Sequence, residues 1–257
     1  MSASLAADEL SVADLERRFG GLRRLYGDAA YGKLRAARVA VVGLGGVGSW
    51  AAEALARCGV AELTLIDLDH VSEGNINRQL QALGRTVGQS KAQALCERLT
   101  DIHPGCALHP VEEFVEAGNW PALLPQPIDA LLDACDQVRA KATLAAWALD
   151  HRTAFVSVGA AGGKQRPQAV EVSDLAEATH DPLLASLRQR LRQHHGAARR
   201  GPMGVSCVYS REAVRQPEQG CDIEGNLNCH GYGSSVTVTA TFGMVAASEV
   251  MRLWMAR

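Results

Sequence analysis

The sequence lacks paired cysteines. It has seven cysteines among 257 residues, an odd number, and no two of them form a C-x-x-C pair. Structural disulfides and zinc ribbons both need cysteines in pairs, so we expect neither of them. The cysteine content therefore predicts a chain without zinc that works in a reducing, cytoplasmic environment.

The chain also has little that would direct it to a membrane or spread it over a nucleic acid. Its longest weakly polar run, 234–248, is followed by Glu249 and is shorter than the roughly 20 apolar residues of a transmembrane helix. The first basic residue, Arg17, comes after four acidic ones, which is the reverse of a secretory signal. With 26 basic and 28 acidic residues the net charge is −2, which excludes a uniformly basic protein but allows a local basic patch.

Strand-like and helix-like patterns alternate through the central part of the chain. The strand-like segments are short apolar runs, at 38–43, 63–67, 107–111, 128–135 and 154–158. The helical segments carry apolar residues at helical spacing, at 47–58, 88–102 and 139–149. Because apolar strands alternate with helices, we predict a Rossmann-like α/β fold with a doubly wound, mostly parallel sheet.

The two ends of the chain depart from this alternation. The first 37 residues form a polar, Arg-rich lead-in, and the pattern loosens again beyond residue 164. In that later part the predicted elements are a strand at 168–172, a polar helix over 174–195 and a loop over 201–233. We therefore expect one domain, 1–257, made of the lead-in 1–37, a nucleotide-binding core 38–165 and an irregular C-terminal extension 166–257.

A glycine-rich segment follows the first strand. Residues 43–48 read GLGGVG and match the G-x-G-x-x-G pattern, between a strand and a helix. Such glycines allow a tight turn and let backbone amides approach a phosphate at a helix N-terminus. Asp67 ends the second strand, where a carboxylate can bind ribose hydroxyls. These residues predict a nucleotide-binding enzyme, and a glycine turn required only for helix–strand packing is the alternative.

The segment that begins at Asp67 favours a triphosphate over a dinucleotide. It gathers two acidic, two amide and one basic side chain, those of Asp67, Asp69, Asn75, Asn77 and Arg78. Lys91 follows in the first turn of the next helix, and Asp136 lies just past the fourth strand. A triphosphate under attack needs cations beside its phosphates, and Asp136 is placed to hold Mg²⁺ that bridges them. The alternatives are solvated side chains and a helix cap at Asp136.

Taken as a set, these motifs resemble the adenylating domain of E1-like enzymes, which include ubiquitin-activating enzymes and bacterial relatives in thiamine and molybdopterin synthesis. The segments GLGGVG, LIDLD, NINRQ and VGQSK, with Asp136, carry the resemblance. It implies that ATP is bound, that a carboxylate is converted into an acyl-adenylate, and that Asp136 holds Mg²⁺. The implied nucleotide-binding residues are Gly43, Gly45, Gly46 and Gly48 at the phosphates, Asp67 at the ribose with Asp69 beside it, and Asn75, Asn77, Arg78 and Lys91 as a clamp.

Almost from end to end the chain resembles one bacterial subgroup of this family, the tRNA threonylcarbamoyladenosine dehydratases. Segments such as RFGGLRRLYG, GAAGGK, VSDLAEATHDPLL and TVTATFGMVAASEV carry this resemblance. It implies that ATP activates the threonine carboxylate of a modified adenosine beside the tRNA anticodon, and that the carbamoyl nitrogen then closes a ring with loss of water. It also implies a homodimer, in which Arg24 or Arg23 reaches the ATP of the neighbouring subunit, and an associated cysteine desulfurase with its sulfur acceptor. The catalytic residues are then Arg24, Arg78, Lys91 and Asp136.

A basic strip lies in the C-terminal extension. No acidic residue occurs between Asp181 and Glu212, an interval that holds six arginines and two adjacent histidines. This local excess of positive charge is typical of a surface that contacts nucleic-acid phosphates, and a solvated helix face followed by a loop is the alternative. The candidate tRNA-binding residues are Arg188, Arg190, Arg192, Arg199 and Arg200.

Three further possibilities remain open at the level of the sequence. Cys207 or Cys229 is a candidate acceptor of the activated group, with burial in the core as the alternative. The chain could instead activate a ubiquitin-like sulfur-carrier protein, although enzymes of that kind generally carry two C-x-x-C zinc pairs. An NAD-binding oxidoreductase would prefer NAD to ATP and would be indifferent to the loss of Arg78, Lys91 or Asp136.

Overall fold

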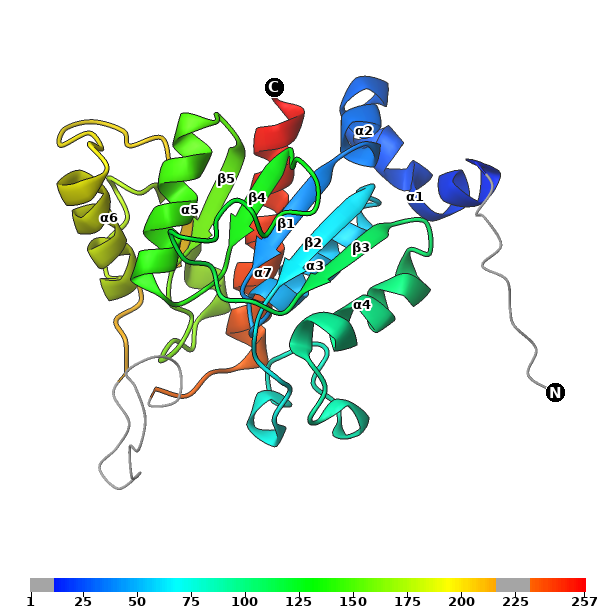
Figure 1. The fold of residues 1–257 in the computed structure, drawn as a ribbon, viewed down its shortest axis with the longest axis horizontal. Coiled ribbons are helices and arrows are strands. Elements are labelled where there is room, and N and C mark those ends of the chain that lie inside the picture. The colour runs from blue at the N-terminus through cyan, green and yellow to red at the C-terminus, as the bar shows by residue number, and fades with distance from the viewer. Residues whose placement is uncertain (1–11, 216–231) are drawn as a thin grey trace.

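The fold is built on a seven-stranded sheet with helices packed against it (Figure 1). The computed structural model describes residues 12–215 and 232–257. The strands lie in the order β3-β2-β1-β4-β5-β7-β6, and every neighbouring pair is parallel except β6 with β7. Their bounds are β1 Arg38–Val42, β2 Glu62–Ile66, β3 Ala107–Val111, β4 Ala130–Asp133, β5 Ala154–Val158, β6 Val170–Asp174 and β7 Ser206–Ser210.

The helices connect these strands and extend the chain at both ends. The α-helices are α1 Val12–Tyr26, α2 Asp28–Arg35, α3 Gly48–Arg57, α4 Lys91–Ile102, α5 Val138–Asp150, α6 Pro182–His194 and α7 Val236–Met255. Short 3₁₀ turns are η1 Glu73–Asn75, η2 Gly84–Thr86 and η3 Pro167–Ala169. Among the described residues, no helix is both long and apolar enough to cross a membrane.

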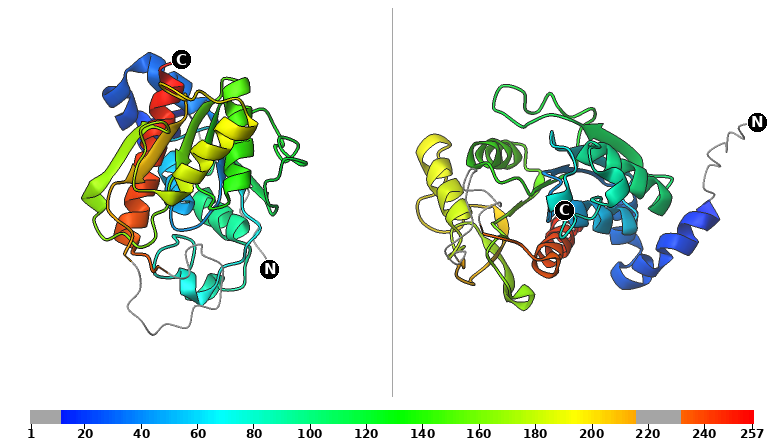
Figure 2. Two further views of the ribbon diagram at one scale, coloured as in Figure 1. Left: turned by 90° about the vertical axis from the view of Figure 1, so that its left-hand side faces the viewer. Right: turned by 90° about the horizontal axis from the view of Figure 1, so that it is seen from below.

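Both faces of the sheet are covered by apolar side chains. In β1, Val39 and Val41 pack in a cluster with α3, α4 and α7, whereas Ala40 and Val42 pack with α5 and α6. Figure 2 shows α5 and α7 on opposite sides of the sheet. Parallel strands that are buried on both faces need apolar residues at successive positions, which explains runs such as RVAVV and AFVSV. The predicted doubly wound, mostly parallel α/β fold is confirmed.

Residues 206–210 form a strand where the sequence pattern predicts a loop. β7 lies between β5 and β6, and its central residues Cys207, Val208 and Tyr209 are fully buried. The run SCVYS is short, and serines occupy both of its ends, so its apolar pattern is a weak strand signal. Pairing with a strand on each side supplies the stabilisation that the local pattern does not show. The prediction of a continuous loop over 201–233 was wrong in this part.

The predicted helix over 174–195 is shorter in the structure. β6 extends to Asp174, and α6 begins only at Pro182. Asp181 sets this start, because its Oδ1 accepts the amide of Leu184 at 3.0 Å and a proline is favoured at the first helical position. The weakly polar run 234–248 belongs to α7, which is buried against the sheet with Phe242 and Val250 fully covered.

The described part of the N-terminal lead-in, 12–37, contains two helices, α1 and α2, docked at the amino ends of the strands (Figure 1). Phe19 of α1 is buried, and its ring centroid lies 4.6 Å from that of His103, between α4 and β3. The guanidinium of Arg35 in α2 lies 4.7 Å from the Phe19 ring, and its Nη1 is 3.2 Å from His103 Nε2. Because His103 precedes β3, this contact fixes α1 and α2 at the amino edge of the sheet.

The His103 contact makes stability depend on pH. Burial, helped by the charges of Arg35 and Arg18, lowers the pKa of His103 to about 4. In the unfolded chain the histidine titrates near about 6.5, so between these pH values only the unfolded chain binds the proton. Stability is therefore complete above the unfolded pKa and falls as the pH drops toward 4. In urea unfolding, we expect wild type to lose about 2 kcal/mol between pH 7 and pH 5 that His103→Leu does not lose. Equal losses in the two proteins would contradict this assignment.

Candidate nucleotide-binding site

The strand order reverses between β1 and β4, and the loops after these strands meet at the carboxyl edge of the sheet. In doubly wound sheets ligands bind at such a reversal. The GLGGVG loop follows β1, Asp67 follows β2 and Asp136 follows β4. The start of α7 reaches the same edge, because Asn77 Nδ2 donates to the Ser234 carbonyl at 2.9 Å. The fold thus gathers segments from four separate parts of the sequence.

Close backbone packing fixes the glycine loop. Gly43 has a φ of +85°, and a Cβ there would lie 2.7 Å from the backbone nitrogen of Cys135. A Cβ at Gly48 would overlap the Gly43 carbonyl oxygen. At Gly45, by contrast, a Cβ would meet no other atom within 4 Å. Packing within the protein therefore explains Gly43 and Gly48, whereas Gly45 borders open space.

Asp67 connects the glycine loop to the end of β2. Its Oδ2 accepts the amide of Leu44 at 2.6 Å, and its Oδ1 accepts the amide of Asp69 at 2.9 Å. Burial raises the pKa of the Asp67 carboxyl, and Lys91 together with the two amides opposes that rise. Each carboxylate oxygen has a second lone pair, so ribose hydroxyls can still donate to it.

Lys91 begins α4 and is only 6% exposed. Its Nζ lies 2.7 Å from Asp69 Oδ2 and 3.9 Å from Asp67 Oδ1. These two carboxylates offset the positive charge of the buried Lys91 side chain. The structure therefore brings together the predicted ribose carboxylate and the predicted phosphate cation, and a bound phosphate would share the three N–H donors of Lys91 with these carboxylates.

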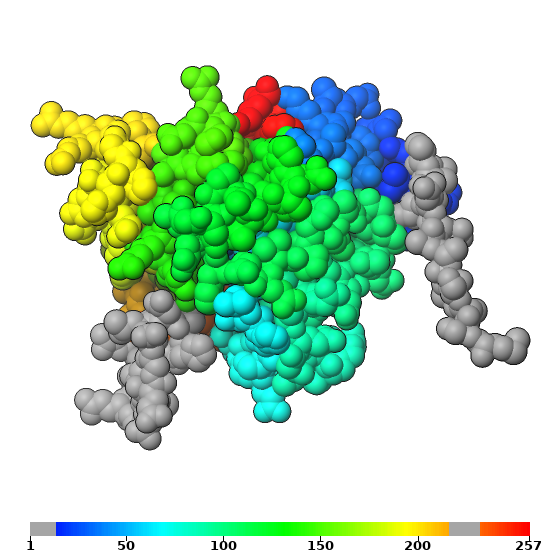
Figure 3. Space-filling view, in the orientation of Figure 1, coloured from blue at the N-terminus to red at the C-terminus, as the bar shows by residue number. Residues whose placement is uncertain are grey.

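The segment between β2 and α4, cyan to blue-green in Figure 3, projects from the carboxyl edge. Asn75 is buried there, and its Oδ1 accepts the amide of Ser72 at 3.1 Å, which closes the turn η1. In this position Asn75 shapes the loop that carries Asn77 and Arg78. Its predicted contact with the triphosphate stays a prediction.

Arg78 lies against the glycine loop. Its Cγ would be 3.2 Å from a Cβ at Gly46, which places the side chain beside the phosphate loop. One guanidinium nitrogen, Nη1, donates to the Gly74 carbonyl at 2.7 Å and to Asn77 Oδ1 at 2.9 Å. These contacts orient the side chain and leave Nη2 and Nε as donors for an anion. The structure thus brings Arg78 to Gly46, as a phosphate clamp requires.

Asp136 is exposed in the turn between β4 and α5, and it makes no hydrogen bond or ion pair within residues 12–215 and 232–257. The N-cap residue of α5 is Gln137, so a capping role does not account for Asp136. Those same residues contain no group of three or more His, Cys, Asp or Glu side chains that could hold a metal. Mg²⁺ on a nucleotide commonly takes one or two carboxylates and fills its remaining positions with phosphate and water. A single unengaged carboxylate fits that donor set.

Arg24 lies outside this site. It is an exposed residue of α1, at the amino edge of the sheet, and its side chain makes no hydrogen bond or ion pair in the described part of the chain. Arg23 is engaged internally, because its Nη2 lies 2.8 Å from Glu16 Oε1. A role at a nucleotide would therefore need a second copy of the chain, and Arg24 is the better placed of the two arginines.

The predicted basic strip follows α6 away from the carboxyl edge. The start of α6 is held there by Asp181, whose Oδ2 accepts the amide of Ala160 at 2.8 Å. Its 13 residues extend about 20 Å, so the strip ends near the amino edge. There, the amides of Met203 and Gly204 donate to Asp174 at the end of β6.

The arginines of the strip differ in how they are engaged. Arg188 Nη1 donates to two backbone carbonyls, and Arg192 Nε donates to the Ala198 carbonyl at 3.1 Å. The side chains of Arg190, Arg199 and Arg200 make no hydrogen bond or ion pair with described residues. Arg188 and Arg192 thus also have structural roles, which the sequence pattern did not reveal.

The described cysteines are free thiols: Cys58, Cys96, Cys106, Cys135 and Cys207. Cys207 is fully buried in β7, where burial raises the pKa of its thiol far above the usual value. A buried thiol that does not ionise is a poor nucleophile, which favours the packing role for Cys207. Cys229, the other predicted candidate, lies outside the described residues.

A buried network that the sequence pattern did not predict lies directly behind the turn of Asp136. Asp133 at the end of β4 and Lys141 in α5 form an ion pair of 3.0 Å, and both are fully buried. One signal was available, because a lysine is out of place in the otherwise apolar run AKATLAAWAL. Only the packing of α5 on the sheet shows that this lysine points inward.

A doubly wound sheet with a phosphate-type glycine loop at its reversal point, a ribose-type carboxylate and a nearby pair of cations defines a nucleotide-binding α/β protein. Within that class, the model of the ThiF family matches residues 18–257. The chain belongs to the ThiF family, and the predicted relationship to E1-like adenylating enzymes is confirmed.

Relatives from this family match nearly the whole chain. The tRNA threonylcarbamoyladenosine dehydratase of Escherichia coli is 42% identical over 253 residues, which cover 94% of each chain. The Haemophilus influenzae protein of the same name is 37% identical over 245 residues, covering 93% of this chain and 94% of that one. The solved structure of the E. coli enzyme in complex with ATP has a TM-score of 0.86 at 41% identity, over 96% of this chain and 97% of that chain.

Two glycine variants separate the packing role from the ligand role of the loop. Gly48→Ala places a Cβ on the Gly43 carbonyl oxygen, so we expect a loss of about 3 kcal/mol in unfolding free energy. Gly45→Ala meets no protein atom, so the melting temperature should stay near that of wild type while ATP binding weakens about tenfold or more. Thermal unfolding and titration calorimetry measure the two effects. Normal ATP affinity in folded Gly45→Ala would remove this loop from the binding site.

Proposed function

We propose that this chain is an ATP-dependent tRNA threonylcarbamoyladenosine dehydratase. The observation that carries the proposal is similarity over nearly the full length to two bacterial enzymes of that name, at 42% and 37% identity. In this chain the GLGGVG loop, Asp67, Arg78 and Lys91 also lie together. The resemblance of the sequence motifs to this subgroup implies the same activity.

The reaction has two chemical steps. The threonine carboxylate of the modified adenosine attacks the α-phosphorus of ATP, so an acyl-phosphate bond forms and pyrophosphate leaves. The carbamoyl nitrogen of the same modification then attacks the acyl carbon and loses its proton, and AMP leaves with the carboxylate oxygen. The nucleoside has lost one water and gained a ring. Adenylation is needed because a free carboxylate would have to expel oxide, and ring closure is favoured because the nucleophile is already tethered.

Different residues of the site bind different parts of ATP. Backbone amides of the glycine loop, at the start of α3, approach the phosphates, and Asp67 accepts hydrogen bonds from the ribose. Arg78 and Lys91 place positive charge where negative charge develops as pyrophosphate leaves. Their pairing with carbonyls and carboxylates of the chain holds both side chains in place before ATP arrives.

Asp136 would hold Mg²⁺, which supplies charge neutralisation at the phosphates when bound. Support for this role comes from the exposed and unengaged carboxylate at the strand reversal. The protein's own contribution is to fix the direction of that carboxylate through the turn after β4. No zinc enters the proposal, because the chain has no C-x-x-C pair.

Two copies of the chain would complete the catalytic machinery. Arg24 lies at the amino edge, far from the glycine loop of its own chain, so we assign it to the ATP of a partner in a homodimer. The free thiols of the described cysteines fit a reducing cytoplasm. A cysteine desulfurase with its sulfur acceptor is the associated system that the subgroup implies.

Activation of a sulfur-carrier protein is the second candidate function. It would use the same adenylation site, but the carboxylate activated would be the C-terminus of the carrier protein and not the threonine carboxylate of a modified tRNA. What disfavours it is the absence of the paired zinc cysteines that enzymes of that kind carry. An NAD-dependent oxidoreductase is disfavoured by Arg78 beside the glycine loop, since NAD needs no such clamp.

Mass spectrometry of nucleosides tests the function directly. When modified tRNA is incubated with the protein and Mg·ATP, the threonylcarbamoyladenosine should lose one water, and only when ATP is present. Arg78→Ala should slow this conversion about 100-fold or more, because a cation beside the phosphates is removed. Arg85→Ala is the matched control, since Arg85 is an exposed arginine in the same projecting segment. No mass change with wild type would move the proposal to a sulfur-carrier substrate.

The unengaged arginines of the strip are proposed to contact tRNA phosphates. Replacing Arg190, Arg199 and Arg200 together by alanine should weaken tRNA binding and reduce the slope of log affinity against log salt by about one for each phosphate that is no longer neutralised. ATP affinity should not change, because these residues lie along and beyond α6. Filter binding at several salt concentrations measures the slope, and an unchanged slope would show that the strip is solvated surface.

A further inference from the structure

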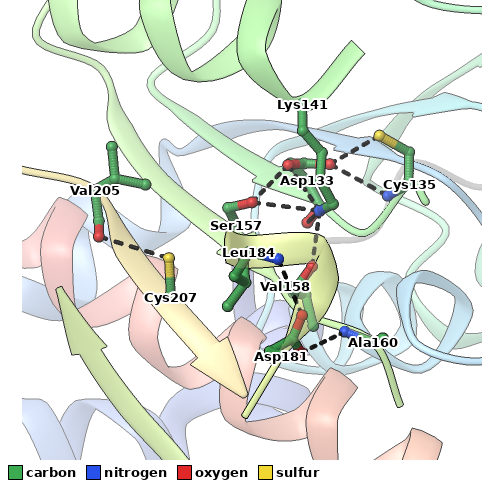
Figure 4. A network of polar contacts seen from close by, with 10 residues as sticks. All are labelled: Asp133, Cys135, Lys141, Ser157, Val158, Ala160, Asp181, Leu184, Val205 and Cys207. Carbon is green, nitrogen blue, oxygen red and sulfur yellow. Dashed lines mark hydrogen bonds and ion pairs between the residues drawn. The ribbon is translucent and has the colours of Figure 1, made fainter. Parts of the chain in front are cut away.

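A buried charged network lies directly behind the turn that carries Asp136 (Figure 4). Asp133 ends β4, Ser157 lies in β5 and Lys141 lies near the start of α5, and all three side chains are fully buried. Lys141 Nζ and Ser157 Oγ both donate to Asp133 Oδ2, at 3.0 and 2.7 Å. The network therefore joins the carboxyl ends of two neighbouring strands to the helix that follows.

Every polar group of this network has a partner. Lys141 Nζ also donates to the Val158 carbonyl at 2.7 Å and lies 3.3 Å from Ser157 Oγ. The other oxygen of Asp133, Oδ1, accepts the amide of Cys135 at 3.2 Å and its thiol at 3.0 Å. Burial disfavours the charge on Lys141, but the Asp133 carboxylate outweighs this and raises the pKa of the ammonium.

Stability alone does not explain a charged network in this layer. The network lies in the layer between the sheet and α5, whose cluster of buried apolar side chains includes Leu131 and Leu144. Apolar residues of similar volume usually stabilise such a position as well as a buried ion pair does, or better. Unlike apolar packing, the charged network fixes the positions of particular groups, because the Asp133 carboxylate accepts hydrogen bonds from four donors and holds each of them in place.

One residue held by Asp133 lies next to the nucleotide site. Its Oδ1 fixes the amide of Cys135, the residue before Asp136. The backbone nitrogen of Cys135 is also the atom against which Gly43 packs, at 2.7 Å from a Cβ built there. In the same turn the amide of Ala134 donates to the Val42 carbonyl at 2.8 Å. The turn after β4 is thus clamped between Asp133 below it and the start of the glycine loop beside it.

We propose that Asp133, Lys141 and Ser157 are positioning residues, which hold the turn after β4 so that Asp136 and the glycine loop face the same Mg·ATP. This inference rests on the proposed function for its ligand. None of the three residues touches the nucleotide, and all of them act through the backbone of Ala134 and Cys135.

The chain offers a matched pair of serines for the test. Ser157 Oγ donates to the buried Asp133 at 2.7 Å, and Ser206 Oγ donates to the buried Glu249 at 2.8 Å. Ser206 begins β7 and so lies at the amino edge, away from the glycine loop. Ser157→Ala and Ser206→Ala therefore each remove one serine–carboxylate hydrogen bond, and only Ser157→Ala removes it behind the site.

We expect both variants to be destabilised to a similar extent in thermal unfolding. Only Ser157→Ala should raise the Kd for ATP in the presence of Mg²⁺, by about tenfold, with a smaller change in EDTA. Hydrogen exchange at the amides of Ala134, Cys135 and Asp136 should also become faster in Ser157→Ala and not in Ser206→Ala. A second variant, Cys135→Ala, removes the thiol donor to Asp133 Oδ1 and should change ATP affinity in the same direction.

Unchanged ATP affinity and unchanged exchange at residues 134–136 in folded Ser157→Ala would overturn the positioning role. A different experiment tests the proposed function. Wild-type protein that binds Mg·ATP but leaves modified tRNA unchanged would overturn the dehydratase assignment, and the comparison of the two serine variants would still decide the positioning role.

Discussion

The nucleotide site depends on one close backbone contact, between the end of β1 and the start of α3. At Gly48 a side chain would overlap the Gly43 carbonyl oxygen, so the helix can begin against the strand only if residue 48 is glycine. Gly43 in turn packs against the backbone of Cys135 in the turn after β4. This contact, together with the packing of Gly43 against Cys135, sets the distances between the glycine loop, α3 and the turn of Asp136.

Charges at the site are balanced within the chain in two different ways. Lys91 pairs with Asp69, whose side chain is 59% exposed, so an incoming anion has access to this pair. Asp133 and Lys141 are fully enclosed, and no anion from solvent can reach them. The first arrangement suits a group that exchanges partners when ATP binds. The second suits a group whose partners stay fixed, as positioning requires.

The residues that are predicted to be functional lie at both edges of the sheet. The carboxyl edge carries the glycine loop, Asp67, Arg78, Lys91 and Asp136, because parallel strands all end there. The amino edge carries α1 with Arg24, and the basic strip reaches it along α6. On the proposed function this separation has a use, since a tRNA and a second subunit are large enough to engage surfaces that no small substrate would span.

Patterns within the chain were enough to predict the alternation of apolar strands and helices, the phosphate-type glycine loop and most of the residues beside it. These features are local: each strand or glycine turn is specified by residues a few positions apart. The strand at 206–210 was not predicted, because its stabilisation comes from β5 and β6 on either side and not from its own pattern. The two N-terminal helices were not predicted either, since Phe19 finds its partner only at His103.

Which side chains meet depends on the packing of the whole fold. Ser157 and Asp133 are 24 residues apart and join because β4 and β5 are neighbours in the sheet. Asn77 and Ser234 are 157 residues apart and join because α7 begins beside the projecting segment. The same packing lets Arg188 hold backbone carbonyls while Arg190 remains unengaged by described residues, although both stand in one basic run. A local sequence pattern indicates which residues of one segment are buried. Strand order and helix packing determine how far apart residues of different segments lie, and hydrogen bonds and ion pairs depend on those distances.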